Sequence, residues 1–229
     1  MAITTCIFDA YGTLFDVAAA ARIAAGEPGR ESFAAHWPAI AENWRQKQVQ
    51  YTWHRTITGN YCTFWEVTEH ALDWALEAEG MADDPALRAR LLQLYRELEA
   101  YGEVRTTLKA LKDAGLNTAI LSNGSPEMLE AAVQSASIGE LLDDVLSVDR
   151  LQIFKPARPV YDMVGQRFLC AVDEVLFVSS NGWDAAGAAD FGFHTAWINR
   201  AGAPMERLPG TPSHILPDLS GIPALAAAL

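Results

Sequence analysis

Three short apolar runs, each stopped by polar residues, constrain the fold of this chain most. The runs are residues 6–8, 118–121 and 175–178, and the polar groups after them are Asp9, then Ser122 and Asn123, then Ser179, Asn181 and Asp184. Runs of this length, bounded by turn residues, are typical of buried strands. Two further runs, residues 145–148 and 195–198, alternate with helical patterns. This alternation predicts an α/β fold with a doubly wound parallel sheet.

The segment between the first and second strands has a different pattern, because apolar residues recur there at helical spacing and no strand pattern interrupts them. We expect Pro38 in the first turn of a helix, and Asp83 or Asp84 before Pro85 to start another. Five of the seven tryptophans lie in this segment, and we interpret most of them as bundle core: Trp37, Trp44, Trp53, Trp65 and Trp74. The sequence therefore predicts an α/β core domain, residues 1–15 and 99–229, and an inserted helical cap domain, residues 16–98. A cap at this place can close over a site and exclude water. From Gly202 to Pro223 we expect surface loops, followed by a short final helix.

Charge and cysteine content limit the partners. The net charge is −12, from 17 basic and 29 acidic residues, which argues against a nucleic acid or an anionic membrane as partner. The three cysteines are scattered and odd in number, as expected for reduced thiols. We see no signal peptide and no apolar stretch of about 18 residues, and we expect a cytoplasmic protein.

The polar groups that follow the strands are the candidate site. Because the carboxyl ends of parallel strands meet at one edge of a sheet, Asp9 and the residues after the later strands are expected to gather there. Lys155, which precedes Pro156, supplies a cation for these carboxylates or for an anionic substrate. The alternative is that Asp9 only caps the next segment and that the other groups make local turn bonds.

Five segments resemble a known family. They are residues 8–14 (FDAYGTL), 44–48 (WRQKQ), 121–125 (LSNGS), 155–156 (KP) and 179–184 (SSNGWD). They look like the motifs of the haloacid-dehalogenase-like superfamily and, within it, of the 2-haloacid dehalogenases that act on the L enantiomer. The similarity runs from residue 3 to about residue 202, including the cap, and implies a Rossmann-like core with a helical cap.

Two positions favour the dehalogenases over the phosphatases of the same superfamily. Phosphatases typically carry a second aspartate two residues after the nucleophile, where this chain has Tyr11, and an acidic residue where it has Asn181. Mg²⁺ prefers carboxylate oxygens, so the site is expected to hold metal poorly. The resemblance therefore implies no metal and no other cofactor.

The resemblance also implies a role for each site residue. Asp9 attacks the halogen-bearing carbon of a 2-haloalkanoic acid and forms an ester, which water then hydrolyses to the inverted hydroxy acid. The halide would leave toward Arg45, Asn123 and Trp183, and the substrate carboxylate would be held by Ser122, Lys155 and the backbone amides after Asp9. The remaining implied assignments are Lys155, Asp184 and Asn181 for orienting water and nucleophile, Thr13, Tyr161 and Ser179 for support, and Tyr11, Gln46, Val49, Phe64 and Trp183 for the apolar wall. Ordinary packing is the alternative for the wall residues. The family further suggests a homodimer.

Two other functions compete with this interpretation. A phosphatase of the same superfamily would hydrolyse phosphate monoesters with Mg²⁺. A non-catalytic binding module would keep the fold without turnover, although such a module has no need of Asp9, Arg45, Lys155 and Asp184 together.

Overall fold

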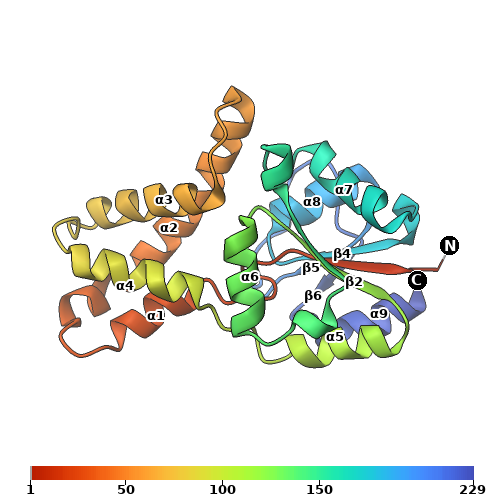
Figure 1. The fold of residues 1–229 in the computed structure, drawn as a ribbon, viewed down its shortest axis with the longest axis horizontal. Coiled ribbons are helices and arrows are strands. Elements are labelled where there is room, and N and C mark those ends of the chain that lie inside the picture. The colour runs from red at the N-terminus through yellow and green to blue at the C-terminus, as the bar shows by residue number, and fades with distance from the viewer. Residues whose placement is uncertain (1) are drawn as a thin grey trace.

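The structure, a computed structural model, describes residues 2–229 and contains a six-stranded, wholly parallel sheet (Figure 1). The strand order is β3-β2-β1-β4-β5-β6, so β1 lies between β2 and β4. The bounds are β1 Thr5–Phe8, β2 Asn117–Ser122, β3 Asp144–Ser147, β4 Val175–Ser179, β5 His194–Ile198 and β6 His214–Leu216. The doubly wound parallel sheet predicted from the sequence is confirmed.

Helices cover both faces of this sheet. In Figure 1, α5 and α9 lie on one side of the strands and α7 and α8 on the other. Their bounds are α5 Val104–Asp113, α6 Pro126–Ser135, α7 Arg158–Phe168, α8 Gly182–Phe191 and α9 Ile222–Ala228, with short 3₁₀ turns η1 Gly139–Leu141, η2 Val148–Leu151, η3 Val172–Glu174 and η4 Leu219–Gly221. Because strands β1, β2 and β4 are buried on both faces, apolar residues run through the middle of each one without polar alternation.

The prediction of loops from residue 202 to residue 223 was wrong in part. β6 lies in that stretch and pairs in parallel with β5, with Ile215 opposite Trp197. Ile215 is half exposed, so this edge strand has little of the apolar pattern by which the other strands were found. The predicted short final helix is present as α9.

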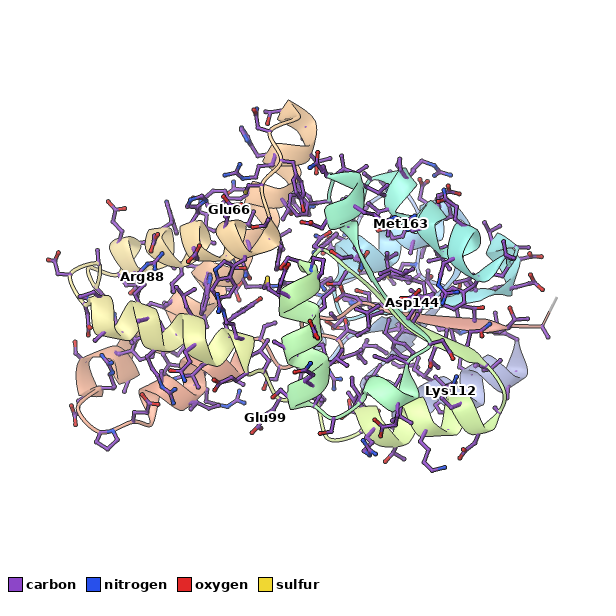
Figure 2. All side chains as sticks on the ribbon, in the orientation of Figure 1. Glu66, Arg88, Glu99, Lys112, Asp144 and Met163 are labelled. Carbon is purple, nitrogen blue, oxygen red and sulfur yellow. The ribbon has the colours of Figure 1, made fainter. Side chains whose placement is uncertain are left out.

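The helices of the segment after β1 pack on one another to one side of the sheet (Figure 1). They are α1 Ala19–Ala25, α2 Glu31–Thr58, α3 Phe64–Ala78 and α4 Pro85–Arg96. We call the sheet and the helices that cover it the sheet body. In Figure 2, Glu66 and Arg88 mark α3 and α4, on the opposite side of the molecule from Asp144 and Met163 of the sheet body. Asp84 caps α4 by accepting a bond from the amide of Leu87, as expected. We call these four helices the cap, and its limits at residues 16 and 98 stay a prediction.

One expectation for the cap was wrong. Pro38 lies inside α2 and not in its first turn, because the helix already begins at Glu31; it forgoes one backbone bond there. Most of the five tryptophans do pack in the core, and the exceptions are Trp53 and Trp74, with 37% and 38% of their surface exposed. Trp44 is buried as expected, and Trp37 and Trp65 are partly buried against the core. Helical spacing shows which residues share a face but not whether that face is covered.

Among the described residues, none of the helices is both long enough and apolar enough to cross a membrane.

Candidate active site

Asp9 lies one residue beyond β1, at the carboxyl edge of the sheet, and its side chain is 9% exposed. The tight turn after it depends on Gly12, whose φ of +89° favours glycine. This turn brings the Thr13 hydroxyl back to donate to Asp9 Oδ2 at 2.9 Å. The side-chain Nδ2 of Asn181, from the loop after β4, donates to the same oxygen at 2.9 Å. One oxygen of Asp9 is thus held by two donors that come from two strand ends.

Lys155 lies on the other side of Asp9. Its ammonium contacts Asp9 Oδ1 at 3.2 Å and Asp184 Oδ2 at 2.9 Å, and its side chain is 1% exposed. Asp184, in the first turn of α8, is fully buried and accepts a second bond from the Tyr161 hydroxyl at 2.8 Å. A buried lysine flanked by two carboxylates makes a charged cluster in which the ammonium compensates both carboxylates.

The pKa values of this cluster follow from burial and from its charges. Burial lowers the pKa of Lys155, but Asp184 and Asp9 outweigh it, so the pKa is raised above its ordinary value. Burial raises the pKa of Asp184, with Lys155 opposing and Asp9 reinforcing that rise. Burial and the neighbouring Asp184 raise the pKa of Tyr161 well above its ordinary value. Tyr161 therefore stays a hydrogen-bond donor, and Lys155 stays an ammonium at neutral pH.

Arg45 connects the cap to this cluster. It projects from α2, and its guanidinium donates to Asn181 Oδ1 at 2.8 Å and, more weakly, to the carbonyl of Tyr11 at 3.4 Å. Because Asn181 in turn donates to Asp9, Arg45 is one residue away from the nucleophile candidate. A guanidinium stays charged and is weakly hydrated, which suits the binding of an anion.

A cleft of about 750 Å³ adjoins Arg45 and Asn181. Its walls come from α2, α3, the loop after β4 and the start of α8, and they include Gln46, Val49 and Trp183 as well as the exposed Trp53 and Trp74. The rings of Trp53 and Trp183 meet edge to face with centroids 5.6 Å apart. Gln46 also binds Glu42 of its own helix.

Tyr11 and Phe64 lie deeper than the cleft walls. Both are 3% exposed, and their ring centroids are 5.8 Å apart. Tyr11 also stacks on Tyr95 of α4, so cap and sheet body share an aromatic layer beside Asp9. Packing and pocket lining are both compatible with this position.

Three of the predicted site residues accept hydrogen bonds from backbone amides in the structure. Asn123 Oδ1 accepts from the amide of Lys155 at 2.9 Å, Ser122 Oγ accepts from Gly124 N at 3.1 Å, and Ser179 Oγ accepts from Asn181 N at 3.2 Å. None of these three side chains makes a hydrogen bond with Asp9, so the structure brings them to the same edge without bonding them to the nucleophile.

Two residues that bond to Thr13 were not predicted from the sequence. The amide of Ser180 donates to the Thr13 hydroxyl at 2.8 Å, and Arg200 donates to the carbonyl of Thr13 at 3.3 Å. Ser180 lies within the 179–184 motif, so that motif was the available signal. Arg200 follows β5 and carries no such signal in the sequence.

Within residues 2–229, no cluster of three or more His, Cys, Asp or Glu side chains is suited to a metal ion. The two carboxylates at the sheet edge, Asp9 and Asp184, share Lys155 as their counter-ion.

Comparisons with known proteins identify relatives of this chain. The family profile of the haloacid dehalogenase-like hydrolases matches residues 3–192. The (S)-2-haloacid dehalogenase 1 of Pseudomonas sp. strain CBS-3 is 44% identical over 99% of this chain and 98% of its own. A solved dehalogenase with an intermediate complex is 42% identical, with a TM-score of 0.93 over 99% of this chain and 98% of its own.

A further solved structure is the L-2-haloacid dehalogenase of Xanthobacter autotrophicus with chloropropionic acid covalently bound. It is 36% identical and covers 97% of this chain and 98% of its own, with a TM-score of 0.86. The resemblance stated from the five motifs is confirmed. The chain belongs to the haloacid dehalogenase-like hydrolases and, within them, to the family of the (S)-2-haloacid dehalogenases.

Proposed function

We propose that this protein removes halide from short-chain L-2-haloalkanoic acids by hydrolysis, giving D-2-hydroxy acids through an ester on Asp9, without a metal. The observation that carries the proposal is the exposure of the Asp9 carboxylate and the charged groups around it. Its carboxylate is slightly exposed and already neutralised by Lys155 at 3.2 Å, and it lies beside the Asn181–Arg45 pair at the cap boundary. The covalently bound chloropropionic acid of the Xanthobacter relative supports a covalent route.

In the first step, an oxygen of Asp9 attacks the 2-carbon on the side opposite the halogen. The new C–O bond forms as the carbon–halogen bond breaks, and the halide leaves with the electron pair. Arg45 is the cation nearest to the Asn181 side of Asp9 and would receive the halide. Ser122, the backbone amides after Asp9, and Lys155 would hold the substrate carboxylate. Asn123 and Trp183 would complete the halide side, and Tyr11, Gln46 and Phe64 the apolar side.

In the second step, water attacks the carbonyl carbon of the Asp9 ester. The acyl–oxygen bond breaks, the departing oxygen takes one proton of the water and leaves as the hydroxy acid, and the oxygen of the water stays in Asp9 while the second proton goes to solvent. The 2-carbon is attacked only once, so its configuration inverts. Lys155, Asp184 and Asn181 surround the carboxyl and would orient the water, and Thr13, Tyr161 and Ser179 would keep these groups in place.

The charge balance of the site supports a metal-free reaction. A divalent ion at Asp9 and Asp184 would have to displace the Lys155 ammonium, which contacts both carboxylates and is 1% exposed. Removal of one partner from a buried ion pair costs about 3–5 kcal/mol. Displacement of a carbon-bound halide needs a free carboxylate and an anion pocket, and these side chains supply both.

The test is chloride release from the two enantiomers of 2-chloropropionate in EDTA, with Asp9→Asn and, as matched control, Asp16→Asn in the next loop. We expect release from the S form only, its loss in Asp9→Asn and its retention in Asp16→Asn. In a single turnover in ¹⁸O-water, label should enter the Asp9 peptide before the product. Magnesium-dependent phosphatase activity without chloride release would make the chain a phosphatase, and label in the product alone would indicate direct attack by water.

A homodimer and a cytoplasmic location stay predictions, which light scattering and fractionation can test.

A further inference from the structure

The loop that delivers Lys155 is fixed from two directions. Asn123, at the end of β2, accepts a bond from the amide of Lys155 at 2.9 Å. The amide just before it, that of Phe154, donates to Thr56 Oγ1 at 3.1 Å. Thr56 belongs to α2 of the cap, 98 residues away in the sequence. Two consecutive amides beside the lysine are therefore held by two different parts of the molecule.

A second residue, in the connection between α2 and α3 of the cap, contacts the same part of the sheet body. The Tyr61 hydroxyl donates to Asp149 Oδ1 at 2.6 Å, and the Tyr61 ring stacks on Phe154 with centroids 5.0 Å apart. Burial, and then the bond to Asp149, raise the pKa of Tyr61, so its hydroxyl remains a donor. In Figure 1 the C-terminal end of α2, drawn in orange, stands next to the segment of the sheet body that leads into α7.

The same helix also reaches the opposite side of the nucleophile. Thr56 follows Arg45 by eleven residues, which is about three turns of helix, so the two side chains point in the same direction about 16 Å apart along the axis. Arg45 acts on Asp9 Oδ2 through Asn181, and Thr56 acts on Asp9 Oδ1 through the loop of Lys155.

We propose that Thr56 and Tyr61 are positioning residues that let the docked cap hold Lys155 against Asp9 and Asp184. Neither touches the reacting atoms, and the inference rests on the proposed function for its link to turnover. The competing explanation is that they merely attach the cap, in which case their loss would weaken docking and substrate binding without changing the chemistry of bound substrate.

The experiment compares three threonine variants of the full chain. Thr56→Val keeps the shape but removes the acceptor, Thr56→Ser keeps the acceptor, and Thr58→Val is the matched control. Thr58 is exposed on the same helix, and its hydroxyl bonds only to the carbonyl of His54. An unpaired, part-buried amide is costly, so for 2-chloropropionate we expect about a tenfold fall in kcat in Thr56→Val, at a KM within about twofold. Thr56→Ser and Thr58→Val should retain kcat.

Hydrogen exchange at the Phe154 amide gives a readout that does not need turnover. Exchange should accelerate in Thr56→Val and stay slow in Thr56→Ser and Thr58→Val. The inference would be overturned if exchange at the Phe154 amide were unchanged in Thr56→Val, or if that variant changed KM alone. It would also be overturned if kcat fell as far in Thr56→Ser as in Thr56→Val. If the wild-type chain releases no halide, the proposed function fails, and the exchange rates still decide whether Thr56 fixes the loop. If Thr56→Val does not fold, Tyr61→Phe, which keeps the stacked ring, is judged by the same criteria.

Discussion

Replacement of Lys155 by methionine tests the charge cluster directly. Methionine fills a similar volume but leaves Asp9 and Asp184 without the ammonium that lies 3.2 and 2.9 Å from them. Each contact is worth a gross attraction of about 5 kcal/mol at an effective dielectric constant of about 20. Much of this attraction is offset by desolvation of the charges, so the measured loss of stability should be about 3–5 kcal/mol. For a chain of this size, that corresponds to a fall in Tm of roughly 6–20 °C.

The loss of stability in Lys155→Met should also depend on pH, in a direction that the pKa shifts determine. In the wild type, the raised pKa of Lys155 contributes stability that is complete below its unfolded value, about 10.4, and is lost as the pH rises through the folded value. The variant should lack this alkaline loss. Without Lys155, burial and Asp9 raise the pKa of Asp184, and only the bond from the Tyr161 hydroxyl still opposes that rise. The contribution of Asp184 is then present at low pH and lost as the pH rises, so the deficit should be smaller at pH 5 than at pH 8.

Thermal unfolding at pH 5, 8 and 10.5, together with halide release at pH 8, checks the argument. Lys109→Met removes an exposed pair with Asp113 and should change Tm by no more than about 2 °C. We expect Lys155→Met to release no halide. An unchanged Tm at pH 8, or a larger deficit at pH 5 than at pH 8, would refute the view that Lys155 compensates two buried carboxylates.

Two further substitutions test neighbouring contacts. Arg45→Lys keeps the charge but loses the planar donors that reach Asn181, and kcat/KM for 2-chloropropionate should fall at least about tenfold in steady-state kinetics; an unchanged value would exclude the guanidinium from the halide site. Tyr161→Phe removes a bond that holds down the pKa of Asp184, so the acidic limb of the kcat profile should move to higher pH, and stability should fall by about 1–2 kcal/mol. A profile that does not move would mean that ionisation of Asp184 does not limit turnover.

Much of the fold was predictable because buried parallel strands contain near-continuous apolar runs. β1, β2, β4 and β5 lie within one or two residues of the predicted runs, and the polar residues after β1, β2 and β4 do meet at one edge. β6 has three residues with a half-exposed isoleucine, so its pairing with β5 rather than its composition makes it a strand. The interior position of Pro38 likewise depends on packing of the whole of α2, which local rules do not include.

The candidate site was predictable where a strand end determines the position of a side chain, as for Asp9 and Asp184. It was not predictable where contact depends on how the cap docks. No local pattern shows that the Thr56 hydroxyl meets a backbone amide 98 residues later, or that the Asn123 side chain accepts from Lys155. The same holds for Trp53, whose ring meets Trp183 across the cleft.

The length of α2 has a consequence for how chains of this design can vary. An inserted residue turns everything after it by about 100° around a helix axis. A single insertion or deletion between Arg45 and Thr56 would therefore swing one of the two side chains away from the sheet edge, whatever residue was added. Gains and losses of length in the cap are expected instead in its connections, such as residues 26–30 and 79–84. An insertion there does not rotate two side chains of one helix relative to each other.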